Sequence, residues 1–220
     1  MILVLDDVLM KIVLTSVRSS LAKAWSNYCG DLDFVEIYHG SILDVRCDAV
    51  VSPANSFGFM DGGIDGIYMD YFSSEIQLKV RRNIFDFHHG ELLVGEATIV
   101  ETDNKQIPFL IAAPTMRVPM PLNESVNPYL SARAVFLLIK YGKFSTGQYE
   151  GKRISDCVDT VAFPGLGTGT GGINSNICAR QVRAAINDIL LEQYKMPKSW
   201  AEASERHQLL YTNTPRRLQY

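Results

Sequence analysis

The sequence predicts an α/β fold, arranged as a three-layer α/β/α sandwich with a mixed, largely parallel sheet. Three observations carry this prediction. Segments with strand-like and helix-like hydrophobic patterns alternate along the chain. Two glycine-rich loops each stand between an expected strand and an expected helix. Hydrophobic residues make up 47% of the 220 positions, which is enough for the core of one large domain.

The first part of the chain has the pattern strand, helix, strand. Residues 11–16 form a short apolar run, and residues 34–38 are rich in the β-branched and aromatic side chains that favour strands. Between them, apolar side chains recur at helical spacing until Gly30 ends the helix. These side chains are Leu21, Ala24, Trp25 and Tyr28.

A buried strand over residues 49–51 is expected next, followed by the first glycine-rich loop at residues 58–63. One long helix should follow this loop, because apolar residues then recur every three or four positions up to residue 80. The stripe consists of Ile64, Ile67, Tyr68, Tyr71, Phe72, Ile76 and Val80.

The second half repeats the alternation. Strands are expected at residues 96–101, 109–113 and 160–163, with a proline-rich loop and a helix between the second and the third. The second glycine-rich loop, at residues 165–172, leads into a helix that Asn174 or Ser175 can cap. The polar tail from Met196 onward contains one further short helical pattern, near residues 200–210.

Charge and composition narrow the class of protein. The chain carries 21 basic and 24 acidic side chains, a formal net charge of −3, which argues against non-specific binding to nucleic acid. No uninterrupted apolar stretch is long enough to span a membrane. The four cysteines are widely spaced and have no histidine cluster beside them, so we expect no metal site and no disulfide framework. We expect one cytoplasmic domain over residues 1–220, with no cofactor.

Each glycine-rich loop sits where an α/β sheet binds ligands, between the carboxyl end of a strand and the start of a helix. Glycine lets the backbone approach a ligand closely, and free N–H groups with the helix dipole attract an anion. Two such loops suit a diphosphate flanked by two sugars better than they suit a single phosphate. The alternative for either loop is a tight turn that needs small residues for packing.

Three segments resemble the signatures of macro domains. They are DAVVSPAN at residues 48–55, GGIDGI at 62–67 and VAFPGLGTG at 161–169, in the order and separation of that family. The resemblance extends over about residues 34–194, so the strand–helix–strand before it and the polar tail after it are expected to be additions. Macro domains bind ADP-ribose and its derivatives, and some hydrolyse bonds at the distal ribose.

The resemblance implies a role for individual residues. Asn55 matches the amide that hydrogen-bonds the distal ribose, and Asp65 matches the aspartate thought to orient or activate a water, so both are expected catalytic residues. Without the family, Asn55 could hold its loop through an Asx turn, and Asp65 could simply favour a helix dipole. The expected ligand-binding residues are Ser41, Ile42, Asn55, Gly62, Gly63, Gly165, Leu166, Gly167, Thr168, Gly169, Thr170 and Gly171.

Three departures from the family pattern point to a divergent branch. Ser41 replaces the aspartate that reads the adenine amino group, which removes a charge-assisted hydrogen bond. Ser52 and Pro53 replace the first Asn-Ala of the turn, and Gly171 stands where many members have an aromatic residue.

Arg117 is a cation near a strand end, either an exposed loop arginine or a group that reaches a ligand anion.

Two main functions are open at this point, besides the nucleic-acid binding of some macro domains, which the net charge of −3 supports little. The first is a hydrolase that acts at the distal ribose of a mono-ADP-ribosyl ester, O-acetyl-ADP-ribose or ADP-ribose 1″-phosphate. The alternative is a module that binds ADP-ribose or another NAD-derived signal without turnover. The expected partner in both cases is ADP-ribose or an ADP-ribosylated macromolecule.

Overall fold

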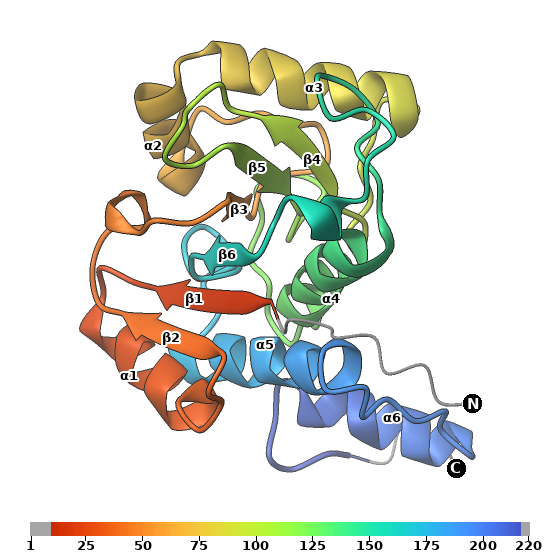
Figure 1. Cartoon of the computed structure of the whole chain (residues 1–220). Helices are drawn as coiled ribbons and strands as arrows, with labels where there is room; N and C mark the ends of the chain where they lie inside the picture. Colours follow the sequence, from red (N-terminus) through yellow and green to blue (C-terminus); the bar gives the residue numbers. More distant parts are fainter. Residues whose placement is uncertain (1–9, 217–220) are drawn as a thin grey trace, which may run out of the picture.

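The computed structural model describes residues 10–216, and a six-stranded sheet with the order β2-β1-β6-β3-β5-β4 forms its centre (Figure 1). Every neighbouring pair is parallel except β4 and β5, which run antiparallel, so the expected mixed and largely parallel sheet is confirmed. The strands are β1 (Lys11–Thr15), β2 (Val35–Tyr38), β3 (Ala49–Ser52), β4 (Thr98–Glu101), β5 (Phe109–Ala112) and β6 (Thr160–Phe163).

Helices cover both faces of this sheet, and Figure 1 shows α2 and α3 on one side with α1 and α5 on the other. The α-helices are α1 (Ser19–Cys29), α2 (Gly63–Phe72), α3 (Glu75–Phe87), α4 (Asn127–Tyr141), α5 (Ser175–Ile189) and α6 (Trp200–Leu209). Two short 3₁₀ helices, η1 (Ile42–Asp44) and η2 (Ile154–Asp156), complete the elements.

The strands build two separate cores because successive side chains point to opposite faces of a sheet. In β1, Ile12 and Leu14 pack with α1, α4 and α5, whereas Val13 belongs to the core under α2 and α3. Ala162 in β6 likewise faces α2 and α3, and its two neighbours face the other core. Both faces are therefore buried, which explains why these strands are apolar runs rather than alternating ones.

The prediction of one long helix over residues 64–80 was wrong, because α2 ends at Phe72 and α3 begins at Glu75. Ser73 between them has a φ of 80°, which no continuous α-helix permits. The apolar stripe is interrupted as well, since 48% of Ile67 and 37% of Tyr71 are exposed. The hydrophobic period continues across the junction between the two helices, so this pattern did not show where the first helix ends.

The N-terminal strand–helix–strand is part of the central sheet. Strand β1 pairs with β2 on one side and with β6 on the other, and the Trp25 side chain of α1 is fully buried. In the tail, α6 contacts α5 through Arg180, whose guanidinium donates to the carbonyls of Leu209 and Thr212. No helix within residues 10–216 is long and apolar enough to cross a membrane.

Candidate functional site

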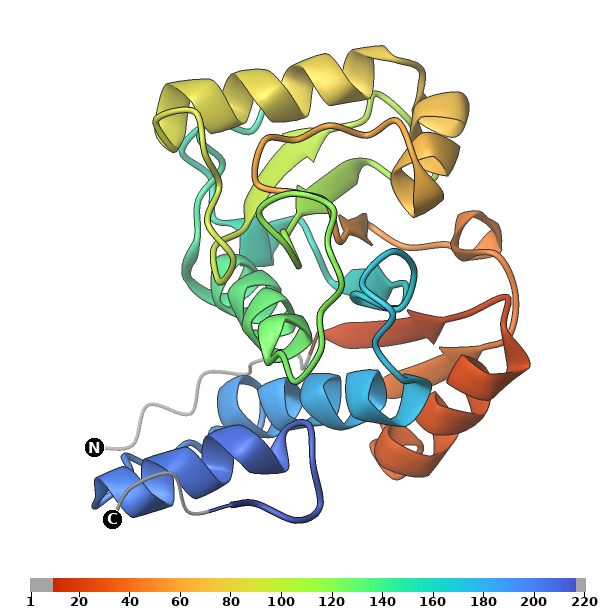
Figure 2. The same cartoon turned by 180° about the vertical axis from the view of Figure 1, so that it is seen from behind.

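The carboxyl ends of the parallel strands open on one edge of the sheet, and the predicted site residues gather there. Strands β3 and β6 are neighbours in register, so the loops that follow Ser52 and Phe163 leave the sheet side by side. The loop after β5 joins them: the N–H of Leu122 donates to the carbonyl of Gly171 at 2.8 Å, and Asn55 bridges to Met116. Figure 2 shows these three loops together in front of the sheet.

Asp65 lies in the first turn of α2, at the base of this edge. Only 8% of the residue is exposed, and its Oδ1 accepts a hydrogen bond of 2.5 Å from the hydroxyl of Ser52. Ser52 is the last residue of β3 and is itself fully buried. A carboxyl from the helix and a hydroxyl from the central strand thus meet where the strand gives way to the loop.

Burial raises the pKa of Asp65 from 3.8 to about 7, and the hydrogen bond from Ser52 only partly opposes that rise. No cation is among the groups that shift this pKa. Tyr68, one helical turn further on, is fully buried and donates its hydroxyl to the carbonyl of Val51 at 3.0 Å. A carboxyl that titrates near neutral pH can take or release a proton during a reaction.

The side chain of Asn55 holds its own loop. Its Oδ1 accepts from the N–H groups of Phe57 and Phe59, and its Nδ2 donates to the carbonyl of Phe59 at 2.8 Å. This is the Asx-type turn that the sequence left open as an alternative to ligand binding. Asn55 therefore shapes the path of the chain from β3 to α2, and its amide has few hydrogen-bonding positions left for a ligand.

Gly62 and Gly63 leave open space at the start of α2. A Cβ atom added to either glycine meets no atom within 4 Å, and Gly63 has a φ of 58° that side chains rarely adopt. Gly62 is the N-cap residue of α2 and supplies no side chain to bond the first N–H groups of the helix. The backbone at this helix N-terminus is accessible to a ligand, two residues from Asp65.

The second glycine-rich loop closes on itself and leaves backbone donors free. The N–H of Ile173 donates to Gly167 and that of Gly172 to Gly169, whereas the N–H groups of residues 167–171 find no acceptor in the described part of the chain. Gly167 has a φ of 67°, and a Cβ atom on Gly171 would lie 2.6 Å from the carbonyl oxygen of Gly167. A loop of this kind can receive anionic oxygens on consecutive N–H groups.

The remaining residues of this loop serve its packing. Leu166 is fully buried in the core between α5 and the sheet, and a Cβ atom on Gly165 would clash with Thr168 and Leu21. Gly169 and Thr170 are exposed at the tip. The guanidinium of Arg18, at the start of α1, donates to the carbonyl of Thr168 at 3.3 Å.

Ser41 and Ile42 lie at the same edge, after β2 at the end of the sheet. The hydroxyl of Ser41 accepts from the N–H of Leu43 and caps η1, while Ile42 is buried. The turn before them is tied to β1, because the N–H of Gly40 donates to the carbonyl of Ser16. Ser41 is thus separated from Asp65 by the strands β1 and β6.

Arg117 makes an ion pair with Glu91 through two hydrogen bonds, of 2.6 and 3.2 Å. This pairing holds the pKa of Glu91 below its usual range and raises that of Arg117. The guanidinium also lies 5.3 Å from the centre of the Phe57 ring. Its place is beside the first loop, where it is bound to protein groups rather than offered to a ligand.

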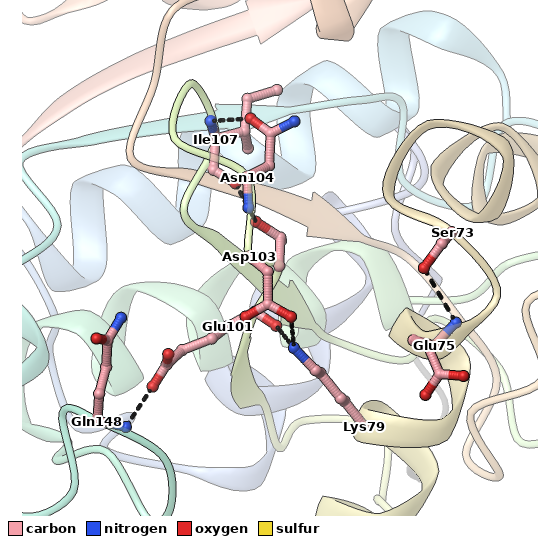
Figure 3. Close-up of polar contacts among 9 residues, drawn as sticks. Ser73, Glu75, Lys79, Glu101, Asp103, Asn104, Ile107 and Gln148 are labelled. Atoms are coloured by element: carbon pink, nitrogen blue, oxygen red, sulfur yellow. Dashed lines mark hydrogen bonds and ion pairs between the residues drawn. The ribbon is translucent and has the colours of Figure 1, made fainter.

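Two concavities lie away from this edge, and none of the predicted site residues lines them. The first, of about 230 Å³, is bounded by the α2–α3 junction and the chain after β4. Figure 3 shows the amine of Lys79 bound to the carboxylate of Asp103 and the carbonyl of Glu101, so two of the charged side chains that line this concavity are paired with each other. The second, of about 250 Å³, lies between α3 and the loop at residues 144–147.

Sequence reasoning missed the Ser52 hydroxyl as a member of the site. Ser52 appeared only as a departure from a family motif, yet a polar residue that ends an otherwise apolar strand was a usable signal. Arg18 was missed too, because nothing in its sequence neighbourhood points to a loop 150 positions away.

Comparison with known proteins agrees with this geometry. A family model described as a macro-like domain matches residues 41–213. An uncharacterized protein of Aquifex aeolicus (strain VF5) is 29% identical over 147 residues, which cover 66% of this chain and 76% of the relative. Within residues 10–216, no three His, Cys, Asp or Glu side chains cluster in a way that could hold a metal ion.

Two solved structures share the fold at low identity. The macrodomain of Mycobacterium tuberculosis DarG has a TM-score of 0.53 and 20% identity, covering 68% of this chain and 87% of that one. A variant of the Oceanobacillus iheyensis macrodomain with ADPR (ADP-ribose) has a TM-score of 0.55 and 19% identity, covering 70% and 76%. The matched family model agrees with the sheet and with the two glycine-rich loops. This chain therefore belongs to the macro-like domain family, as a divergent member.

Proposed function

We propose that the protein binds ADP-ribose or a derivative along the carboxyl edge of its sheet and hydrolyses a bond at the distal ribose. The observation that carries this proposal is Asp65, a buried carboxyl with a pKa of about 7 beside the open backbone of Gly62 and Gly63. The Oceanobacillus iheyensis macrodomain variant, which shares this fold, was solved with ADPR, and this supports the choice of ligand class.

The order of the strands supports an elongated ligand. Ser41 follows β2, the second glycine-rich loop follows β6, and Asp65 stands behind β3, so three strand-to-strand steps separate the two ends. At about 4.8 Å a step, the site is about 14 Å long. An adenosine at the Ser41 end, a diphosphate on the N–H groups of residues 167–171 and a ribose near Asp65 would follow this line.

In the reaction we propose, Asp65 in its ionised form takes a proton from a water molecule, and the water oxygen attacks the acyl or phosphoryl group attached to the distal ribose. The bond from that group to the ribose oxygen breaks, and the ribose oxygen leaves as a hydroxyl after receiving the proton that Asp65 took from the water, which restores the carboxylate. Backbone N–H groups at the start of α2 and in the second loop hold the ligand in place, which supplies part of the rate through orientation. Asn55 contributes by fixing the loop rather than by direct chemistry.

The test combines a binding and a turnover measurement on the full chain. Calorimetric titration with ADP-ribose should give a Kd in the micromolar range, about −8 kcal/mol, and AMP should bind much more weakly. A glutamate-linked ADP-ribosylated substrate should then lose its ADP-ribose in the presence of the wild type. Asp65→Asn should bind ADP-ribose but not turn over, whereas Asp70→Asn, an exposed change on the same helix, should behave like the wild type.

The alternative of a binding module without catalysis has its own outcome. It predicts the same calorimetric result with no release of ADP-ribose by any variant. Ser41 stands where the family has an aspartate, and Gly171 stands where many members have an aromatic residue. Both changes remove ligand contacts that the family resemblance implies, which favours this alternative. Absence of heat with ADP-ribose would exclude both forms of the proposal.

A further inference from the structure

We propose that Ser52 is a positioning residue for Asp65: its hydroxyl holds one carboxyl oxygen so that the other faces the ligand. This inference rests on the proposed function, since it assigns a role within the same site. It concerns a residue that the family resemblance marks only as a departure, and its support comes from contacts in this structure.

The contact between Ser52 and Asp65 joins two rigid elements. Ser52 ends β3 and is paired in register with Ala112 of β5, so the hydrogen-bonded sheet sets the position of its side chain. Asp65 sits in the first turn of α2, 13 residues later, and the loop between them carries both ends to the same point. The hydroxyl of Ser52 therefore acts from the centre of the sheet on a carboxyl at its edge.

The two carboxyl oxygens of Asp65 have different surroundings. Oδ1 accepts the 2.5 Å hydrogen bond from Ser52. Oδ2 has no hydrogen-bond partner among the described residues, and it is also not one of their fully enclosed, unpaired side-chain atoms. With Oδ1 held, rotation about the last side-chain bond of Asp65 is restricted, and Oδ2 remains as the oxygen that a water or a ribose hydroxyl can reach.

Among the described residues, no ionisable group is among the causes that shift the pKa of Asp65. Tyr68 on α2 interacts with Asp65, whose charge raises the pKa of Tyr68, and Cys47 in the segment before β3 acts on Tyr68 in the same direction. Burial raises the pKa of Cys47 to about 12 and raises that of Tyr68 well above its ordinary value, so both are neutral at pH 7. Ser52 is the side chain that favours the charged form of Asp65.

A simpler role for Ser52 is that of a small residue that fills its place in the sheet. The two roles differ in what happens to the proton on Asp65. If Ser52 only fills space, any side chain of similar volume can replace it without a change in the pKa of Asp65. If its hydroxyl positions the carboxyl, loss of the hydroxyl changes that pKa. Loss of a hydrogen bond to a charged carboxylate should raise its pKa by about one unit or more.

The experiment is a ¹³C NMR titration of the aspartate carboxyl groups in the ligand-free protein, with the Asp65 resonance assigned by its absence in Asp65→Asn. The variants are Ser52→Ala, Ser52→Cys, which keeps the shape with a weak donor, and Ser52→Thr, which keeps the hydroxyl. The Asp65 midpoint should rise by about one unit or more in Ser52→Ala and Ser52→Cys and stay near the wild-type value in Ser52→Thr. Urea unfolding curves of each variant are the control for correct folding.

The turnover experiment adds a second readout. In Ser52→Ala, the acid limb of the rate profile should move to higher pH by the same amount as the NMR midpoint, with Ser52→Thr restoring it. An equal loss of rate at every pH would assign Ser52 a filling role and overturn the inference. Unchanged NMR midpoints in Ser52→Ala and Ser52→Cys would do the same. Failure of the wild type to bind ADP-ribose would instead count against the proposed function, because the NMR titration needs no ligand.

Discussion

Replacing Asp65 with asparagine should stabilise the folded protein, and the gain should grow as the pH rises. Burial raises the pKa of Asp65 from 3.8 to about 7, so between these values the folded protein holds a proton that the unfolded chain has released. Stability therefore falls as the pH rises through this window. Asparagine is neutral at every pH, and its side-chain oxygen can still accept the hydrogen bond from Ser52.

The size of the effect follows from the same shift. Three units at about 1.4 kcal/mol each place the full cost of ionising Asp65 in the folded state at about 4 kcal/mol. Near pH 5 the unfolded carboxyl is already ionised, so part of this cost is present there. The additional gain of Asp65→Asn between about pH 5 and pH 8 is then about 2 to 3 kcal/mol, or about 5 to 10 °C in Tm.

Urea unfolding of the wild type and Asp65→Asn at several pH values between 5 and 8 measures this gain directly. Asp70→Asn is the matched control, because it makes the same chemical change at an exposed position of α2. The control should follow the wild type at every pH. A constant difference between Asp65→Asn and the wild type over the whole range would refute the reasoning, since the carboxyl would then titrate alike in the folded and unfolded states.

Four further substitutions test the loops and the end of the site. Asn55→Ala removes three hydrogen bonds within its loop and should lower the free energy of unfolding by about 1 to 3 kcal/mol, together with ADP-ribose affinity, as urea unfolding and calorimetry would show. Gly167→Ala should be destabilising by about 1 kcal/mol or more because of its φ of 67°, whereas Gly169→Ala meets no atom within 4 Å and should leave Tm unchanged. If both alanines lowered Tm equally, backbone conformation would not be the cause. Ser41→Asp should increase the preference for ADP-ribose over its inosine counterpart in calorimetry, because a carboxylate accepts from the adenine amino group but is repelled by the carbonyl oxygen that replaces this group in inosine; equal affinities would show that the base does not lie at Ser41.

The sequence predicted the fold class and the places of the loops because both depend on local chemistry. Strands buried on both faces are apolar runs, helices repeat every three to four residues, and glycines accumulate where the backbone needs positive φ or close approach. These signals located β3, β6 and the two glycine-rich loops within a residue or two. The cap of α5 by Asn174 was also predictable, since a side-chain oxygen at that position meets a free N–H two residues later.

The hydrophobic period did not predict the junction at Ser73, because the period continues across a residue whose φ is 80° and across Ser74, the N-cap residue of α3. The same holds for the choice between two roles of Asn55. Both an Asx turn and a ribose contact fit one amide, and only the path of the loop shows that the amide bonds the backbone of Phe59, while the ribose contact stays a prediction.

What the chain alone determined was which residue types stand after which strands, and this was enough to bring Asn55, Asp65 and residues 165–171 to one edge. What only the tertiary structure decided was the state of those groups. The proton affinity of Asp65 depends on how much water the fold removes from it, and its one hydrogen bond depends on a serine 13 residues away. Desolvation and long-range contact are properties of the packed molecule, so no local pattern contains them.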